Sequence, residues 1–271
     1  SIEDPQAIDA KGGTYLGRRQ RRTSITLPSG RVATAMTYDM EEFLDTCVQK
    51  YVELAGPGTK VKDCATPFLQ EDHRHSPAGA PGDGPCVECP WCKHTFPPKV
   101  FKGVAELEAS TRKKQPVADQ SGQPGGHQQP HQEDRGRLQP IASRVLMKIL
   151  WAARLARFDL LRAVTHLATY VTRWTSECDR KLHRLVGYIQ TTKSHRMIGW
   201  VGDDLRCTQP HLYADADFAG CVTSQRSTSG VHSVLRGPNT CFPVAGQSKR
   251  QGCVSHSTPE AELVATHFAL R

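Results

Sequence analysis

Three acidic residues near the C-terminus have the types and the order that a metal-dependent phosphodiesterase needs. Asp215 and Asp217 lie in an alternating stretch, residues 212–218, which predicts a β-strand with both carboxylates on one face. Glu260 opens a segment with helical spacing of apolar residues, so it belongs to the first turn of a predicted helix. Carboxylates at a strand end and at a helix start can converge on Mg²⁺, which prefers oxygen ligands. Two such ions can clamp the attacking and leaving oxygens of a phosphodiester.

Each of these acids also has a structural interpretation. Ser257 and Glu260 have the spacing of a capping box, in which a hydroxyl and a carboxylate satisfy free amide groups at a helix start. Asp215 and Asp217 can equally be strand-end or turn aspartates near Gly220. Sequence motifs around the acids favour metal ligation over both alternatives.

Four ordered motifs surround these acids. They are YADADFAG at 213–220, RSTSG at 226–230, SKRQ at 248–251 and STPEAE at 257–262. Their order and spacing resemble the ribonuclease H domain of copia-type retrotransposon Pol polyproteins. The resemblance implies that Asp215 is the first catalytic metal ligand and Glu260 the second, with Asp217 and Glu262 as weaker candidates. It also implies Mg²⁺ as the cofactor, and cleavage of RNA in RNA–DNA hybrids by the intact protein.

The chain departs from the family pattern at two points. Pro259 is an extra residue in the last motif, although proline is tolerated in a first helical turn. Family members continue into a further strand with a third catalytic aspartate and then to a fourth ligand, whereas this sequence ends at Arg271. We therefore expect an incomplete site that hydrolyses hybrid RNA weakly or not at all.

The elements upstream resemble other parts of the same polyprotein. The stretch from Tyr15-Leu16-Gly17 to Thr66-Pro67, with a predicted helix from about Asp39 to Leu54, resembles the end of a reverse transcriptase, where the palm gives way to the thumb. Segments 157–164 and 181–189 resemble the connection that follows. Phe158 stands where the family has proline, so we expect one helix to run on through this point. The Asp-Asp pair at 203–204 is out of order for a polymerase site and predicts a turn between two strands.

These resemblances define an α/β (α+β) chain of four segments. We predict the end of the reverse transcriptase palm and thumb at 1–70, a linker at 71–138, a basic helical connection at 139–205, and a truncated ribonuclease H-like mixed sheet at 206–271. Three helices are expected within 139–196 from apolar spacing. The Pro- and Gly-rich linker cannot bury enough apolar surface to offset chain entropy, so it is predicted to be disordered.

Positive charge is concentrated in the predicted helical connection. The net charge is +8, and residues 141–200 hold eleven Lys or Arg against three acids. Such a block can follow a phosphate backbone, although an ordinary solvated helix face is the alternative. The candidate nucleic-acid-binding residues are Arg154, Arg157, Arg180, Lys181, Arg184, Arg226, Lys249 and Arg250. The expected partners are RNA–DNA hybrid or other nucleic acid and the rest of the Pol polyprotein; the alternative function is a non-catalytic, domesticated or decayed nucleic-acid-binding remnant.

A cysteine cluster in the linker has no counterpart in the family. Cys86, Cys89, Cys92 and His94 offer thiolate and imidazole ligands for Zn²⁺, with a redox dithiol or unligated thiols as alternatives. The six single cysteines at 47, 178, 207, 221, 241 and 253 are predicted to be small buried hydrophobic residues. The sequence has no apolar run of membrane-spanning length and residues 1–10 lack a signal-like core, so we expect no membrane contact and an intracellular location, in the cytoplasm or nucleus.

Overall fold

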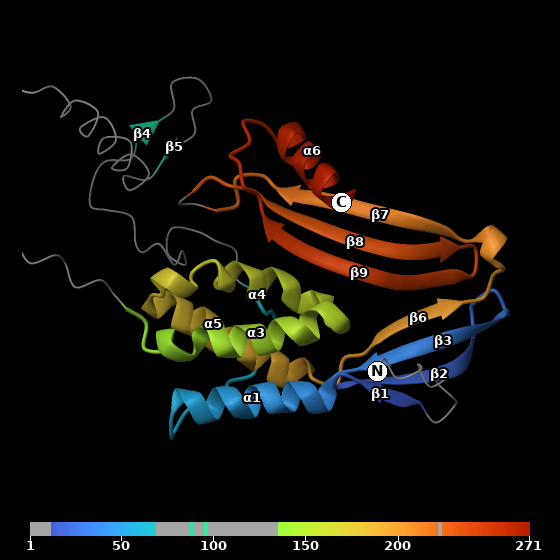
Figure 1. Ribbon diagram of the computed structural model, residues 1–271, viewed down its shortest axis with the longest axis horizontal. Helices are drawn as coiled ribbons and strands as arrows, with labels where there is room; N and C mark the ends of the chain where they lie inside the picture. The colour runs from blue at the N-terminus through green and yellow to red at the C-terminus, as the bar shows by residue number, and fades with distance from the viewer. Residues whose placement is uncertain (1–11, 69–86, 89–94, 97–134, 222–223) are drawn as a thin grey trace, which may run out of the picture.

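The computed structural model describes residues 12–68, 87–88, 95–96, 135–221 and 224–271. This part of the chain forms one seven-stranded antiparallel sheet, a separate pair of two-residue strands, and helices on both faces of the large sheet (Figure 1). The predicted α/β fold class is confirmed. No helix in the described ranges combines the length and the apolar character that a membrane span requires.

The N-terminal strands form a meander that leads into the first helix. The elements are β1 (Gly13–Tyr15), β2 (Arg18–Thr26), β3 (Val32–Asp39) and α1 (Glu41–Ala55). The β1–β2 connection uses Leu16 at φ 51° and Gly17 at φ 82°, which suit a tight hairpin turn. A Cβ atom on Gly17 would lie 3.1 Å from the ring of Phe43, so this turn packs closely on α1.

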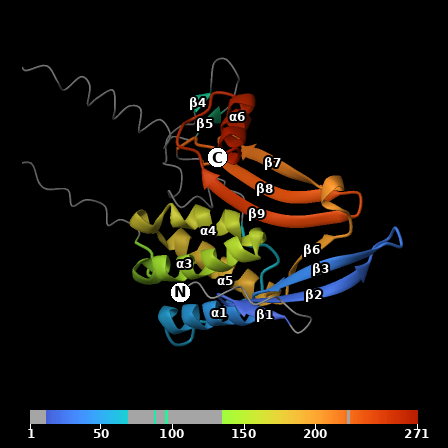
Figure 2. The ribbon, with the colours of Figure 1, turned by 45° about the vertical axis from the view of Figure 1, so that its right-hand side comes forward.

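Four helices share one hydrophobic core. The three helices predicted from apolar spacing are present as α3 (Gln139–Leu155), α4 (Leu161–Ala168) and α5 (Ser176–Thr192), and α1 packs with them. The short helices η1 (Phe158–Leu160) and η2 (Val171–Arg173) connect them. Their fully buried side chains include Leu44, Leu146, Ile149, Leu160, Leu182, Leu185 and Ile189. Figure 2 shows these helices as one group, with α6 separate from them beside β7. The predicted thumb and connection segments thus form a single packed unit, and their exact boundaries stay a prediction.

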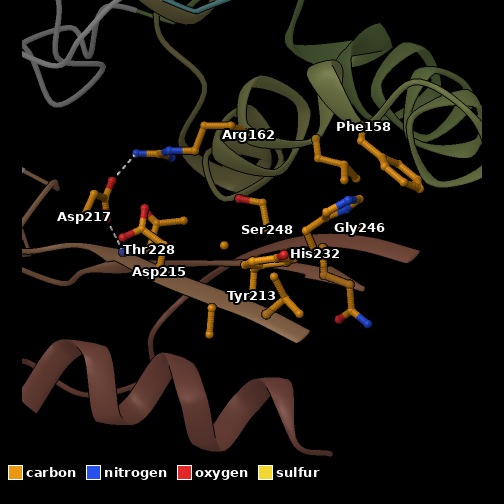
Figure 3. Close-up of a pocket in the computed structure, with 14 residues that line it drawn as sticks. Phe158, Arg162, Tyr213, Asp215, Asp217, Thr228, His232, Gly246 and Ser248 are labelled. Carbon is orange, nitrogen blue, oxygen red and sulfur yellow. Dashed lines mark hydrogen bonds and ion pairs between the residues drawn. The ribbon is translucent and has the colours of Figure 1, made fainter. Parts of the chain in front are cut away.

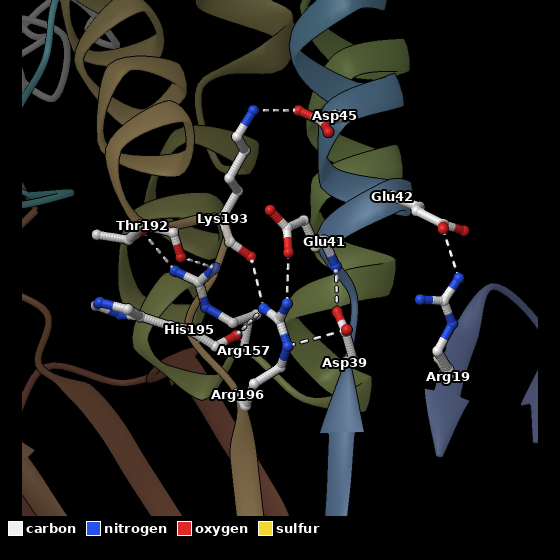
Figure 4. Close-up of polar contacts among 10 residues, drawn as sticks. All are labelled: Arg19, Asp39, Glu41, Glu42, Asp45, Arg157, Thr192, Lys193, His195 and Arg196. Atoms are coloured by element: carbon white, nitrogen blue, oxygen red, sulfur yellow. Dashed lines mark hydrogen bonds and ion pairs between the residues drawn. The ribbon is translucent and has the colours of Figure 1, made fainter. Parts of the chain in front are cut away.

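The prediction that a helix runs on through Phe158 is wrong. Helix α3 ends at Leu155, because Arg157 adopts a non-helical backbone (φ −123°, ψ 63°) and turns its side chain into the protein. Its guanidinium donates to Asp159 at 2.9 and 2.7 Å, and to the carbonyl and hydroxyl oxygens of Thr192 at 2.9 and 2.7 Å. Figure 4 shows Arg157 reaching Thr192 at the end of α5. The buried Arg157 therefore ends the helix just before Phe158.

Ion pairs fix the end of α5 against the start of α1. Lys193 Nζ lies 2.8 Å from Asp45, and the Arg196 guanidinium contacts Asp39 at 3.0 Å and also pairs with Glu41 (Figure 4). These pairs are partly exposed, so each contributes little stability alone. Their geometry places the strand that follows α5 beside β3.

The C-terminal half adds four strands and a helix. They are β6 (Met197–Val201), β7 (Gln209–Asp217), β8 (Thr228–Gly237), β9 (Thr240–Arg250) and α6 (Thr258–Ala269), with a short helix η3 (Leu205–Cys207) before β7. The strand order is β1-β2-β3-β6-β9-β8-β7. Every pairing in it is antiparallel, whereas a mixed sheet was predicted, because β7, β8 and β9 follow one another directly. Strands β6 and β9 share one register pair, Trp200 with Cys241, so the two halves of the sheet meet at a narrow seam.

Single cysteines only partly follow the prediction. Cys47, Cys178 and Cys221 are buried as predicted, and burial raises the pKa of the Cys47 thiol to about 12. Cys207 and Cys253 are exposed, which contradicts the prediction, because they lie in η3 and in the loop before α6, where no other element covers them. Cys241 is half-buried.

The predicted turn at Asp203 and Asp204 is present between β6 and β7. The Asp203 carboxylate accepts hydrogen bonds from the Asn239 side chain at 3.0 Å, the Asn239 amide at 2.7 Å and the Thr240 hydroxyl at 2.8 Å. These donors, the Asn239 side chain first, hold the pKa of Asp203 below its usual value. The turn thereby anchors the start of β9.

This anchor should make part of the stability sensitive to acid. Because the folded-state pKa of Asp203 is lowered, its contribution is present above the ordinary aspartate pKa of about 4 and is lost as the pH falls through the lowered pKa. We expect Asp203→Asn to lower the urea midpoint at pH 7 and to flatten its decline below about pH 4. Asp204→Asn is the control, since the Asp204 side chain is exposed and makes no hydrogen bond or ion pair within the described residues. Parallel pH profiles for wild type and Asp203→Asn would contradict the assignment.

Candidate functional site

A pocket of about 490 Å³ lies between α4 and the three strands β7, β8 and β9 (Figure 3). Its lining residues with functional groups or rings are Phe158, Arg162, Tyr213, Asp215, Asp217, Thr228, His232, Gln247 and Ser248. Gly246 lets β9 approach the helices here, because a Cβ atom at this position would lie 2.8 Å from the ring of Phe158. The pocket therefore gathers two of the predicted site residues with aromatic and cationic neighbours.

The strand period places both aspartates on the same face of β7. Asp215 and Asp217 line the pocket, while Ala216 between them is buried against Ala261 and Ala265 of α6 on the other face. The predicted common orientation of the two aspartates is confirmed. In Figure 3 both carboxylates lie on the side of Arg162, and α6 lies across the sheet.

The two aspartates have different surroundings. Asp217 accepts a hydrogen bond from Arg162 at 2.7 Å and another from the amide of Thr228. Asp215 is exposed, and no hydrogen bond or ion pair joins its side chain to another described residue. Asp217 thus ties α4 to the sheet, and Asp215 is the carboxylate available to a ligand.

Glu260 has the geometry of a helix cap. The Ser257 hydroxyl accepts from the amide of Glu260 at 3.4 Å, and the Glu260 carboxylate accepts from the amide of His256 at 2.7 Å. Pro259 is accommodated in the first turn of α6. This is the structural alternative raised by the sequence. Glu262, two residues after Glu260, is half-buried in the same helix.

The structure does not bring Glu260 to the two aspartates. Helix α6 packs on the face of Ala216, where the Gln251 side chain donates to the carbonyl of Ala261 at 2.9 Å. Glu260 and Asp215 therefore lie on opposite faces of the sheet. Among the described residues no group of three or more His, Cys, Asp or Glu could hold a metal ion. The donor set does not fit Mg²⁺ in this arrangement, because one of the two neighbouring carboxylates is committed to Arg162.

Several predicted nucleic-acid-binding residues are occupied within the protein. Arg157 and Lys181 are 2% and 6% exposed, so their predicted place on a phosphate-contacting surface is wrong. Both point into the helical core, where Arg157 holds Thr192 and the Lys181 ammonium lies 5.9 Å from the Phe68 ring. Arg180 is exposed but pairs with Glu177, and Arg184 donates to Thr66 at 2.7 Å.

The remaining candidates lie nearer the surface. Arg154 and Lys249 are exposed, and the Lys249 ammonium lies 5.1 Å from the ring of Phe268. Arg226 and Arg250 are half-buried, and Arg250 lies 3.5 Å from the hydroxyl of Thr169. The cluster of Cys86, Cys89, Cys92 and His94 falls outside the described residues, so its zinc site stays a prediction.

A basic stripe on α3 lies within the predicted basic block, but of its cations only Arg154 was among the named candidates. Arg144, Met147, Lys148, Trp151 and Arg154 recur at helical spacing on the outward side, and we name these residues the α3 stripe. Met147 and Trp151 are 46% and 41% exposed, and the 17 residues of α3 contain no acid. The absence of any acid between 139 and 155 was the sequence signal that could have identified it.

The stripe continues to the first hairpin. The Trp151 indole donates to the carbonyl of Leu16 at 3.1 Å, and Arg18 donates to the carbonyl of Leu155 at 3.2 Å. These bonds hold the C-terminal end of α3 against the β1–β2 turn. The exposed cations are therefore presented on a rigid support.

Two curated proteins are similar to this chain in sequence. The chain is 33% identical over 119 residues to secreted RxLR effector protein 161 of Plasmopara viticola, and the match covers 43% of this chain and 78% of that protein. The chain belongs to the family of this effector. The chain is 32% identical over 123 residues to the retrovirus-related Pol polyprotein from transposon RE2 of Arabidopsis thaliana, which supports a Pol-like origin.

The match to the Arabidopsis polyprotein covers 45% of this chain but only 8% of the length of that polyprotein. No protein-family model matches the chain. No solved structure matches it either.

Proposed function

We propose that the chain is a piece of the reverse transcriptase and ribonuclease H region of a copia-type Pol polyprotein, and that it binds RNA–DNA hybrid or other nucleic acid without cutting it. The observation that carries the binding function is the α3 stripe, in which Arg144 and Arg154 are exposed and which has no acid in the same helix. The four ordered motifs at 213–262 and the similarity to the Arabidopsis polyprotein support the origin.

The stripe explains how binding occurs without sequence preference. Arg144 and Arg154 are exposed and make no ion pair among the described residues, so they can each neutralise a phosphate and release counterions. Lys148 is less available, because its ammonium donates to the carbonyl of Thr46 at 3.2 Å. Trp151 adds an exposed ring beside these cations for contact with sugars or bases.

The arrangement of acids supports binding over hydrolysis for this chain. Copying of RNA and Mg²⁺-dependent cleavage of hybrids, as implied by the copia-type motifs, are assigned to the whole polyprotein. In that setting Asp215 and Glu260 are the proposed metal ligands. In this chain Glu260 caps α6 on the opposite face of the sheet from Asp215. The alternative of a non-catalytic, nucleic-acid-binding remnant therefore describes the activity of the chain itself.

We expect no measurable hydrolysis of hybrid RNA by this chain in the presence of Mg²⁺. Release of end-labelled RNA from a hybrid, followed by gel electrophoresis, should match a protein-free sample for both wild type and Asp215→Asn. In the same samples, fluorescence anisotropy should show hybrid binding whose affinity falls steeply with salt. Turnover that is lost in Asp215→Asn would contradict the non-catalytic proposal. Affinity that does not change with salt would contradict the phosphate-binding proposal.

A further inference from the structure

A row of three nearly parallel rings lies on β7 and β8, and two of them, Tyr213 and His232, line the pocket beneath α4. The ring centroids of His211 and Tyr213 are 6.3 Å apart with an interplanar angle of 25°, and those of Tyr213 and His232 are 6.4 Å apart at 21°. Strand register fixes the row, because Tyr213 on β7 and His232 on β8 are direct partners. Tyr213 is 45% exposed, so this aromatic surface is accessible from solvent.

Two neighbours hold the rings of Tyr213 and His232 in place. Phe158 packs edge-on against His232, with centroids 6.0 Å apart at 67°. The guanidinium of Arg236 donates to the Tyr213 hydroxyl at 3.2 Å. The rings therefore form a preorganised surface, whose side chains lose little further freedom when a flat ligand binds.

Polar groups with unused hydrogen-bonding capacity lie in the same pocket. The Ser248 hydroxyl oxygen is buried and has no hydrogen-bond partner among the described residues. Asp215 also has no partner in the described part of the chain, and Figure 3 shows both side chains on the pocket side of the sheet. A buried hydroxyl left without a partner is costly, and a ligand that hydrogen-bonds to it removes that cost.

We propose that this pocket binds a nucleobase of single-stranded RNA or DNA. The base stacks on Tyr213 and His232, and its polar edge is met by the Ser248 hydroxyl and the Asp215 carboxylate. A volume of about 490 Å³ lies within the range of small-ligand sites, and stacking on aromatic rings accepts any base. The inference rests on the proposed nucleic-acid binding, but the pocket shares no residue with the α3 stripe. The two surfaces can therefore be tested separately.

The test compares a fluorescent single-stranded oligothymidylate with a duplex of the same length. Tyr213→Ala should raise the Kd for the single strand by about 5- to 150-fold, and leave the duplex Kd and the salt dependence of both unchanged. Tyr213→Phe keeps the ring and should bind within about twofold of wild type. Tyr15→Ala is the matched control, because Tyr15 is 61% exposed on β1, outside the pocket. Melting temperatures establish that each variant is folded.

A second variant tests the same pocket without removing the Tyr213 ring. Ser248→Ala removes a buried hydroxyl that has no partner among the described residues, so it should not lower the melting temperature, and it should weaken single-strand binding several-fold. Adenosine monophosphate distinguishes the source of the base: displacement of the oligonucleotide shows that free nucleotides also enter, and no displacement restricts the site to strands. The inference is overturned if Tyr213→Ala binds the single strand as wild type does, or if Tyr15→Ala weakens binding equally. If the α3 stripe does not bind phosphate, the duplex affinity of the wild-type protein should instead not change with salt concentration.

Discussion

The double variant Arg144→Glu/Arg154→Glu is expected to bind RNA–DNA hybrid roughly 60-fold more weakly than wild type at 0.1 M salt. Each lost phosphate contact removes about 0.9 from the slope of log affinity against log salt, which corresponds to about eightfold in affinity at this concentration. The slope should therefore fall by about 2, and the reversed charges add repulsion. Fluorescence anisotropy at four or more salt concentrations measures both quantities.

The control for this variant carries the same change in net charge at other positions. Lys62→Glu/Arg206→Glu reverses two exposed cations outside α3, one in the segment after α1 and one in η3. We expect this control to lose less than threefold in affinity, since general attraction over a distance is screened at 0.1 M salt. Equal losses in the two double variants would show that net charge, and not the α3 stripe, determines binding.

Arg157→Ala should be the most destabilising single substitution among the basic residues discussed, at about 3 kcal/mol. The guanidinium holds Asp159 and both oxygens of Thr192, and the Asp159 carboxylate also accepts from the Tyr188 hydroxyl at 2.9 Å. Removing the cation leaves these acceptors without their partner in the interior, although Asp159 is 35% exposed and recovers some hydration. Urea unfolding followed by far-ultraviolet circular dichroism measures the change.

Two variants test whether the lost stability comes from the contacts of Arg157 with Asp159 and Thr192. Arg154→Ala, an exposed arginine three residues earlier, should change the free energy of unfolding by less than about 0.5 kcal/mol. Arg157→Lys keeps the charge but cannot reproduce the forked contacts, so it should lose most of the stability that Arg157→Ala loses. A loss below about 1 kcal/mol in Arg157→Ala would refute the assigned role of this network.

The elements with a strong local period were predictable from the sequence. Apolar spacing identified α1 and the three helices of the connection, and alternation around Ala216 placed Asp215 and Asp217 on one face of β7. These predictions succeed because each depends on residues that are neighbours along the chain.

The relations between elements were not predictable in the same way. Glu260 was correctly placed at a helix start, but which face of the sheet α6 covers depends on the path of residues 251–257 and on contacts such as Gln251 with Ala261. Arg157 was predicted to be a surface cation because arginine is usually exposed, but it is buried, in part through its contact with the distant Thr192. The pairing of β3 with β6 likewise joins residues near 35 to residues near 200.

The narrow seam between β6 and β9 has a mechanical consequence for the pocket. A continuous ladder of hydrogen bonds resists bending, but these strands share the single pair of Trp200 and Cys241. The compliance of the sheet is therefore concentrated at this seam. The spacing between the helices and the pocket strands depends on side-chain contacts such as Phe158 of η1 on Gly246 of β9 and Arg162 of α4 on Asp217 of β7. A ligand that widens the pocket works against these few contacts and not against the stiffness of seven strands.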